Sequence, residues 1–581
     1  MASHNFQSSP APAKSMVRRF KDPIHDYIPI PLDVCAIVDT KHFQRLRNIK
    51  QLGTSYYVWP GASHNRFEHC LGVAHLARLM TEHLQKSQPE LAITDRDVRC
   101  VMLAGLCHDL GHGPWSHVWD TQFIPQALKG KKWQHEDASE MMFDDMIKHY
   151  NLDISTQDAT FIKALIIGDN KRCGNPPEKP FLFEIVANKR NGIDVDKFDY
   201  IARDSNAIGE RGNLSLSRLI DSARVIEDEI CYDIKDANQI YEMCYTRFSL
   251  HKRIYHHKTA KAIESMVIDA ILAAEPTLKI AEQIEMPGKY MYLTDEIMTY
   301  IERQVDRPEL KESRQIFTRI HERNLYKCVD YKVFEWDMHD VIKAEITPEH
   351  IVERAKLLDA RPASQEPEGG EFDEVDEQPS QTTDDLEFRE DLEALRPQDV
   401  VVALSQMHHG MQNSNPLDAV RFYSKHNINS AKRARPGDLS LLMPNNFGEV
   451  LLRIYTKDVR YFGIVQAGYR AILQDMRARE TKVPSVPPSP TIAATEPSTP
   501  PRRKPMSRVT SRSQGVFGSA EALSPSLSDN YFMTVGKDFG RKLPTSPPRT
   551  LRSTSTAKRA REEAEVETGA GMSPVRKKRS M

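Results

Sequence analysis

Leu103-Ala-Gly-Leu-Cys-His-Asp-Leu-Gly-His-Gly-Pro-Trp-Ser-His117 is an apolar run that ends in adjacent polar residues and glycines. The spacing of its apolar residues predicts a buried helix, and Gly111 and the residues after it predict a turn. The end of this helix would present His108 and Asp109 to a cavity. Such a pair is poorly suited to a packed core and well suited to a metal site.

Further candidate ligands lie in two other segments of the chain. Ser63-His-Asn-Arg-Phe-Glu-His69 begins a helical pattern and places His69 at its polar start. Near Gly192, three carboxylates follow in close order: Asp194, Asp196 and Asp199. A set of two neutral imidazoles and two carboxylates suits a divalent ion of iron, manganese, zinc or magnesium and does not choose among them.

The order of these residues resembles that of the HD-domain metal phosphohydrolases. Four longer blocks are similar to the eukaryotic SAM-and-HD-domain deoxynucleoside triphosphate triphosphohydrolases: Ile49–Gly53, Tyr56–His69, Cys107–His117 and Asn188–Lys197. The similarity extends from about Arg18 to about Met476, with one insertion. It implies a mainly α fold with a helical HD-domain core and the metal ligands His69, His108, Asp109 and Asp196. No block matches a SAM domain, so we expect that domain to be absent.

The composition excludes several other classes of protein. The 581 residues, 40% of them hydrophobic, can form one large or two ordinary cores. We find no apolar segment long enough for a membrane span and no signal peptide at the N-terminus. The eight cysteines include no CxxC pair, which argues against a disulfide framework or a cysteine zinc site. We therefore expect a soluble intracellular protein without membrane contacts.

Hydrophobic periodicity and composition divide the chain into segments. Helical spacing dominates the first half, and three β-rich runs follow: Val329–Trp336, Asp399–Leu404 and Leu451–Thr456. Residues 360–395 are acidic and contain Pro and Gly, which predicts a disordered insertion. The predicted segments are a disordered N-terminus (1–16), the catalytic core (17–310), an α+β C-terminal lobe (311–480) that contains the insertion, and a disordered basic tail (481–581).

The tail is rich in Pro, Ser, Thr, Arg and Lys. It contains proline-directed kinase motifs that begin at Thr499, Ser546 and Ser573. Basic clusters at 502–504, 558–559 and 576–579 indicate nuclear import or contact with single-stranded nucleic acid. We expect a nuclear protein with a cytoplasmic fraction. The alternative is a tail that only increases solubility.

Hydrolysis that expels an alkoxide needs a proton donor, and three histidines are candidates: His112, His117 and His135. His117 and Asp120 lie three residues apart on a predicted helix, so the carboxylate can orient the imidazole and keep it charged. The resemblance implies that His117 and Asp120 provide the general acid, while His112 and His135 line the site. The alternative for each histidine is a structural hydrogen bond.

A triphosphate requires several cationic partners. The resemblance assigns Arg66, Lys197 and Arg247 to the phosphates, with Mg²⁺ as their counter-ion. It assigns the nucleoside to a second group of residues: Gln51, Leu52, Tyr200, Asp204, His251 and Tyr255. Tyr255 would fill the space of a 2′-hydroxyl and thereby exclude ribonucleotides. The alternative for Tyr255 is ordinary core packing.

The family also has regulatory sites at which GTP and a dNTP activate the enzyme and join subunits into dimers and tetramers. The residues that match the first site are Arg18, Asp39, Gln44, Arg47, Arg323 and Lys327. Those that match the second site are Arg218, Lys235 and Lys258. Three positions depart from the family pattern: Ser215, Ser222 and Asp233. Because a carboxylate at Asp233 would repel a phosphate, we expect the second site to be altered.

Three functions fit these observations. The first is a metal-dependent dNTP triphosphohydrolase that releases a deoxynucleoside and inorganic triphosphate. The second is another HD nucleotide phosphohydrolase or phosphodiesterase, and the third is a nucleic-acid-binding protein with a vestigial HD site. The complete set of metal ligands argues against the third function, and the sugar-binding and phosphate-binding residues argue against the second. We therefore expect the first.

Overall fold

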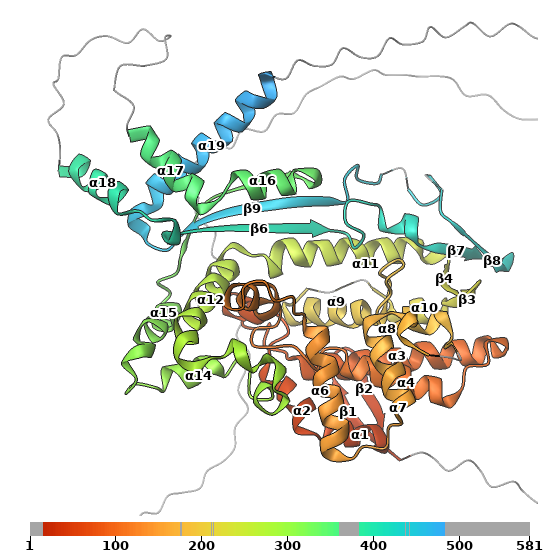
Figure 1. The fold of residues 1–581 in the computed structure, drawn as a ribbon. Helices are drawn as coiled ribbons and strands as arrows, with labels where there is room; N and C mark the ends of the chain where they lie inside the picture. The colour runs from red at the N-terminus through yellow and green to blue at the C-terminus, as the bar shows by residue number, and fades with distance from the viewer. Residues whose placement is uncertain are drawn as a thin grey trace, which may run out of the picture. The chain divides into compact units, whose positions relative to one another are not determined.

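The computed structural model describes residues 16–482, except 175–176, 211, 213, 360–382, 436 and 441. In this part helices predominate, and the strands form three small sheets (Figure 1). The predicted fold class, mainly α with an α+β C-terminal lobe, is confirmed. Of the tails predicted to be disordered, 1–16 and 481–581, only Met16 and the last two residues of α19 (Phe462–Lys482) are described. None of the described helices has the length and apolar character needed to span a bilayer.

The described chain begins with a hairpin and continues as a helical core. Strand β1 (Val17–Asp22) pairs antiparallel with β2 (Asp26–Pro31). The helices that follow are α1 (Leu32–Val38), α2 (Lys41–Gln44), α3 (Arg66–Ser87), α4 (Asp95–Cys107), α5 (Ile124–Ala127), α6 (His135–Tyr150), α7 (Thr156–Ile167), α8 (Phe183–Val186), α9 (Val195–Ala207), α10 (Leu216–Asp221), α11 (Ala237–Leu250), α12 (Lys258–Leu278), α13 (Pro287–Tyr290), α14 (Ile297–Glu302) and α15 (Lys311–His321).

Helix α3 packs against both α4 and α9. Its start is fixed by Glu68, whose side chain accepts a 2.9 Å hydrogen bond from the backbone N–H of Asn65. Asp194 caps α9 by accepting a hydrogen bond from the backbone N–H of Lys197. Gly72 permits a close approach of α3 to α9, because a Cβ atom there would overlap the carboxylate of Asp199. The polar ends of these helices therefore lie close together.

A small sheet joins the core to the C-terminal lobe. Its strands, in spatial order, are β3 (Arg224–Ile226), β4 (Glu229–Asp233), β7 (Arg421–Ser424) and β8 (Asn427–Arg433). Strand β4 pairs with β7 in parallel, with Tyr232 opposite Phe422. The sequence did not predict this sheet, because its strands are short and its central pairing, β4 with β7, joins segments far apart in the chain.

The second sheet of the lobe is antiparallel, in the order β5 (Lys327–Glu335), β9 (Gly448–Thr456) and β6 (Val400–His408). These strands contain most of the three predicted β-rich runs. Together with α16 (His339–Glu345), α17 (Pro348–Asp359) and α19 they enclose a second apolar core that includes Ile342, Ile351 and Val465.

The predicted disordered insertion, 360–395, is too long at its C-terminal end. Residues 360–382 lie outside the described part, but Thr383–Ala394 form helix α18. Leu392 and the following Leu395 are buried in the core of the lobe. Their apolar side chains are widely spaced among acidic residues, so composition alone hid their contribution to the core.

Candidate active site

The start of α3, the end of α4 and the start of α9 bring the predicted metal ligands together. Nε2 of His69 lies 3.1 Å from Oδ1 of Asp196, and Nε2 of His108 lies 3.4 Å from the same oxygen. Oδ2 of Asp109 lies 3.6 Å from Nε2 of His69. These residues come from three segments that are distant in the sequence, so their meeting is a property of the fold.

The donor set fits a divalent cation. Nδ1 of His108 donates a 2.8 Å hydrogen bond to the carbonyl oxygen of Gly105, which leaves the lone pair on Nε2. This Nε2 is buried and has no hydrogen-bond partner within the described part of the chain. A buried nitrogen with a free lone pair beside two carboxylates is the arrangement that a metal ion would satisfy.

A second layer of residues orients His69. Oδ2 of Asp199 lies 2.8 Å from Nδ1 of His69, and Nε of Arg203 donates a 2.8 Å hydrogen bond to the same oxygen. Nε2 of His25 lies 2.6 Å from Oδ1 of Asp199. A carboxylate behind a metal-binding histidine fixes the tautomer of its ring. Of the three candidate carboxylates, Asp196 therefore faces the metal position, Asp199 supports His69, and Asp194 caps α9.

The electrostatic environment of this cluster favours positive charge. Burial by itself would lower the pKa of His69, but its hydrogen bonds to Asp196 and Asp199 raise the pKa to about 10. Burial would raise the pKa of Asp196, but His108 and His69 together hold it below its usual range. The carboxylates thus stay ionised inside the protein and would stabilise a bound cation.

One cavity of about 790 Å³ adjoins the cluster. It is lined by every predicted metal, catalytic and substrate-binding residue except Asp120: Gln51, Leu52, Arg66, His69, His108, Asp109, His112, His117, His135, Asp196, Lys197, Tyr200, Asp204, Arg247, His251 and Tyr255. Its volume falls within the range of small-molecule sites. The residues that the resemblance assigned to the metal, to catalysis and to the dNTP therefore line the same cavity, with the exception of Asp120.

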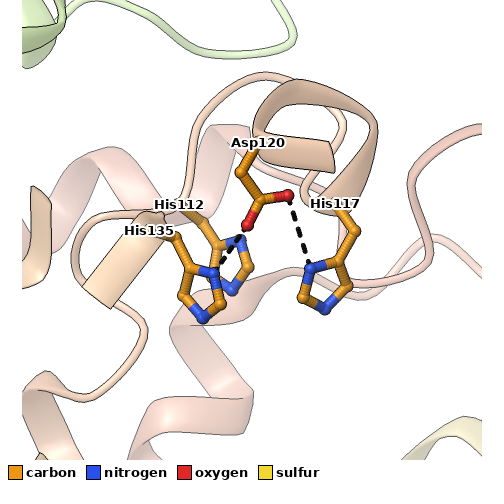
Figure 2. A group of neighbouring side chains, drawn as sticks. All are labelled: His112, His117, Asp120 and His135. Atoms are coloured by element: carbon orange, nitrogen blue, oxygen red, sulfur yellow. Dashed lines mark hydrogen bonds and ion pairs between the residues drawn. The ribbon is translucent and has the colours of Figure 1, made fainter. Parts of the chain in front are cut away.

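Figure 2 shows His117, Asp120, His135 and His112 as a compact group, and its three histidines line the cavity. Nδ1 of His117 lies 3.6 Å from Oδ1 of Asp120, so the predicted pair is close but not hydrogen-bonded. Asp120 instead pairs more tightly with His135, whose Nδ1 lies 2.7 Å from Oδ2. Burial acts to raise the pKa of Asp120, but the neighbouring His117 and His135 hold the pKa below its usual range. Sequence spacing could not reveal the competing partner, since His135 lies on α6.

The cationic side chains are held beside the cavity by partners of the chain itself. Arg66 pairs with Asp109 and donates a 2.8 Å hydrogen bond from Nε to Oγ of Ser116. Nζ of Lys197 lies 2.8 Å from Oδ2 of Asp194. Nη1 of Arg247 donates to the carbonyl oxygen of His408, while its buried Nε has no hydrogen-bond partner within the described residues. Arg247 therefore retains a free donor for an anionic ligand.

Two of the residues that are predicted to bind the nucleoside, His251 and Tyr255, lie where the α-helical geometry is interrupted. His251–Tyr255 form a π-helical turn between α11 and α12, a feature that is frequent at functional sites. The ring of His251 lies edge-on to that of Tyr255, with centroids 4.8 Å apart. The Tyr255 hydroxyl donates a 2.5 Å hydrogen bond to Oδ2 of Asp204, and burial raises the pKa of Tyr255 well above its usual value. Oε1 of Gln51 is buried without a partner among the described residues.

Sequence reasoning missed several residues of the cavity. Gln406 and His408 reach it from β6, so the C-terminal lobe completes its wall. Lys261 and Glu264 form a buried ion pair on α12, and Glu264 also accepts a hydrogen bond from Gln122. The available signal was a lysine and a glutamate three residues apart, at positions that fall among the apolar residues of a helix.

The predicted regulatory residues form separate groups on the surface. Arg18 makes a two-pronged ion pair with Asp39, at 2.6 and 2.8 Å, and Nε of Arg47 donates to Oε1 of Gln44. Arg323 and Lys327 are exposed on another segment, where Nη1 of Arg323 donates to the carbonyl oxygen of Tyr57.

The cationic residues of the second predicted regulatory site lie close to acidic residues. Nε of Arg218 pairs with Asp236, and Nζ of Lys235 lies 4.0 Å from Oδ2 of Asp233. Asp233 also caps the next turn by accepting a hydrogen bond from the backbone N–H of Lys235. Lys258 begins α12 and has a backbone carbonyl that accepts a hydrogen bond from Tyr455. Two of the three predicted cations therefore already have acidic partners.

Comparison with known proteins agrees with this geometry. Residues 66–174 match the HD domain family. The chain is 40% identical to deoxynucleoside triphosphate triphosphohydrolase SAMHD1 of Bos taurus over 469 residues, which are 75% of this chain and 74% of that protein. The chain belongs to the SAMHD1 family of deoxynucleoside triphosphate triphosphohydrolases.

Other members of the SAMHD1 family show similar agreement. The protein of Homo sapiens is 40% identical over 477 residues, 75% of this chain and 70% of that protein. The SAMHD1 homolog of Dictyostelium discoideum is 35% identical over 455 residues, 78% of this chain and 80% of that protein. The HD match includes His69, His108 and Asp109 but ends before Asp196, so the fold is needed to place the fourth predicted ligand.

Proposed function

We propose that this chain hydrolyses dNTPs to a deoxynucleoside and inorganic triphosphate. The observation that carries this proposal is the single cavity lined by the metal cluster, three cationic side chains and the Tyr255–Asp204 pair. A simple phosphodiesterase has no need for several phosphate-binding cations together with a sugar pocket. Membership of the SAMHD1 family supports the same reaction.

The proposed reaction is attack of water on the α-phosphorus and departure of the 5′-oxygen. His69, His108, Asp109 and Asp196 would hold a divalent ion, which supplies Lewis acidity and a water of lowered pKa when bound. Arg66, Lys197 and Arg247 bind the phosphates, accompanied by Mg²⁺. His117 protonates the departing 5′-oxygen, and its 65% exposed ring can reach a ligand that enters from solvent.

The sugar pocket explains a preference for deoxynucleotides. The Tyr255 hydroxyl is fixed by Asp204, whose other oxygen lies 2.7 Å from Nε2 of His64. A tyrosine held on a carboxylate cannot easily rotate away from a 2′-hydroxyl. Gln51 and Asp204 would bind the 3′-hydroxyl, and the unpaired Oε1 of Gln51 supplies an acceptor for it.

We further propose that GTP and a dNTP activate the chain and join it into dimers and tetramers. The grouping of Arg18, Asp39, Gln44 and Arg47 supports a guanine-nucleotide site. In the second site, Asp233 lies beside Lys235 and would weaken binding of a phosphate there. The basic clusters of the tail support a nuclear location and contact with single-stranded nucleic acid.

Product analysis tests the proposed reaction. The full chain, supplied with a divalent metal, GTP and dATP, should release deoxyadenosine and inorganic triphosphate, and less without GTP. His108→Ala and Asp109→Ala should abolish the release. The matched control is His321→Ala, which removes an exposed histidine paired with Glu302. Release of pyrophosphate or monophosphate would instead favour another nucleotide phosphohydrolase, and metal binding without turnover would favour a nucleic-acid-binding protein.

A further inference from the structure

A second group of side chains that could hold a metal ion lies beside the predicted metal cluster, and its three histidines line the cavity. It consists of His112, His117, Asp120 and His135, which each offer a ligand atom within 4.8 Å of the others. Figure 2 shows the three imidazole rings gathered on one side of the Asp120 carboxylate. We refer to these four residues as the three-histidine group.

The three-histidine group is built by close packing of two segments. The rings of His112 and His135 are stacked, with centroids 3.9 Å apart and planes 19° apart. A Cβ atom at Gly111 would overlap the backbone of His135 and Ser139, so glycine is required for this approach. The ring of His117 completes the group, 5.0 Å from His112 and 5.4 Å from His135.

Two atoms of the group are buried and lack hydrogen-bond partners in the part of the chain that the structure describes. They are Nδ1 of His112 and Oδ1 of Asp120. Nε2 of His112 lies 3.2 Å from Oδ1 of Asp109. The other ring nitrogen, Nδ1, is on the side of Asp120. Leaving a buried polar atom unpaired is unfavourable, and a cation between the rings and Asp120 would satisfy both atoms.

We propose that the three-histidine group is a second metal site, which binds Zn²⁺ and thereby inhibits hydrolysis. Three imidazoles and one carboxylate, without a thiolate, form a tetrahedral set that zinc accepts. Ligand atoms bound to zinc at about 2.1 Å lie roughly 3.4 Å apart, so the group needs to contract only modestly. The exposed His117, which precedes the π-helical turn Trp119–Phe123, is free to make this movement.

The inhibition rests on the proposed function. Zinc would take the lone pair of His117 and an oxygen of Asp120, and the same two residues are then no longer available to protonate the 5′-oxygen. The metal cluster of His69, His108 and Asp196 shares no residue with the three-histidine group and keeps its own ligands. Oδ1 of Asp109 lies between the two, 3.4 Å from Nε2 of His108 and 3.2 Å from Nε2 of His112. Both sites can therefore be filled in one chain.

Equilibrium dialysis of the full, metal-stripped chain against Zn²⁺ tests the second site. The wild type should bind two equivalents, and His117→Ala and Asp120→Asn should each bind one. His108→Ala should also bind one, and the double variant His108→Ala/His117→Ala should bind none. His321→Ala is the control and should bind two. The 65% exposed ring of His117 can be removed without disturbing the core, as melting curves would verify.

Binding of one equivalent by the wild type, or of two by His117→Ala, would overturn the site. In the active wild type, whose first site already holds a metal, further Zn²⁺ should lower triphosphate release by about 100-fold or more, the usual contribution of a general acid. Unchanged release at two bound equivalents would overturn the inhibition. If no triphosphate is released at any zinc concentration while two equivalents bind, the proposed function fails and the second site stands.

Discussion

The Tyr255 hydroxyl donates a 2.5 Å hydrogen bond to Asp204, a buried carboxylate that also contacts His64. Tyr255→Phe removes this bond and keeps the ring. Because a hydrogen bond to a charged group contributes about 1.5–3 kcal/mol, kcat/KM for dATP should fall about 10- to 100-fold. Activity toward ATP should remain negligible, since the ring still blocks the 2′-hydroxyl.

The matched variant Tyr255→Ala separates the two roles of this residue. It removes the ring as well, so the ratio of kcat/KM for ATP to that for dATP should rise relative to the wild type and to Tyr255→Phe. Steady-state kinetics with both nucleotides would measure this ratio. Equal ratios in the two variants would contradict steric exclusion by the ring.

Asp199 lies behind His69 and should govern metal affinity without contacting substrate. Asp199→Asn keeps the volume of the side chain but weakens its hold on Nδ1 of His69, so metal affinity should fall about 10- to 100-fold. Competition with a coloured chelator would measure the change. Melting curves would show whether the loss of the Arg203 ion pair also unfolds the chain. Unaltered metal affinity in a folded variant would exclude this supporting role.

Gly111 sets the distance between the metal cluster and α6. In Gly111→Ala the new Cβ atom would overlap the backbone of α6, so the stacked rings of His112 and His135 should separate. We expect a loss of stability of about 3 kcal/mol or more, together with loss of hydrolysis. Gly288→Ala is the control, because a Cβ atom at Gly288 meets nothing within 4 Å. Denaturant titration and the product assay would compare the two variants.

His75 on α3 should make the stability of the chain depend on pH. Burial lowers the pKa of His75 from 6.5 to about 4, and the neighbouring His25 acts in the same direction. Below about pH 6.5 the imidazole of His75 is therefore protonated in the unfolded chain but stays neutral in the folded chain. The free energy of unfolding falls as the pH is lowered from 6.5 toward 4.

The variant His75→Gln cannot take up this proton. Between pH 7.5 and 4.5, the free energy of unfolding of the wild type should therefore fall by about 2 kcal/mol more than that of His75→Gln. The exposed His321→Gln is the control and should follow the wild type. Parallel curves for all three proteins in urea titrations would contradict the argument.

Asp233 lies 4.0 Å from Nζ of Lys235 in the second predicted regulatory site. Asp233→Asn removes a negative charge that opposes a phosphate, an effect of about 1 kcal/mol for two unit charges roughly 4 Å apart in water. The dNTP concentration for half-maximal activation at saturating GTP should fall about fivefold. Asp228→Asn removes an exposed carboxylate from the β3–β4 turn and should not alter it.

The sequence was most informative where function requires particular chemistry at particular spacings. The helix end at His108 and Asp109, and the helix start near His69, could be predicted because local patterns determine helix boundaries. Residue type and spacing alone could not separate Asp196 from Asp194 and Asp199, since all three belong to one polar segment. The family resemblance selected Asp196, and in the fold Asp196 lies beside His69 while Asp199 supports that ring and Asp194 caps α9.

Long-range contacts account for the residues that were missed. The pairing of Asp120 with His135 and the arrival of His408 from β6 depend on segments that sequence periodicity does not relate. The same holds for the buried Leu395, which belongs to a core formed by several distant segments. Local patterns carry no information about such partners.

Hydrolysis in ¹⁸O-labelled water tests the central claim most directly. If water attacks the α-phosphorus of a dNTP held beside the cluster of His69, His108 and Asp196, the inorganic triphosphate should carry one ¹⁸O atom and the deoxynucleoside none. Label in the 5′-hydroxyl of the deoxynucleoside, or in orthophosphate or pyrophosphate, would contradict the account.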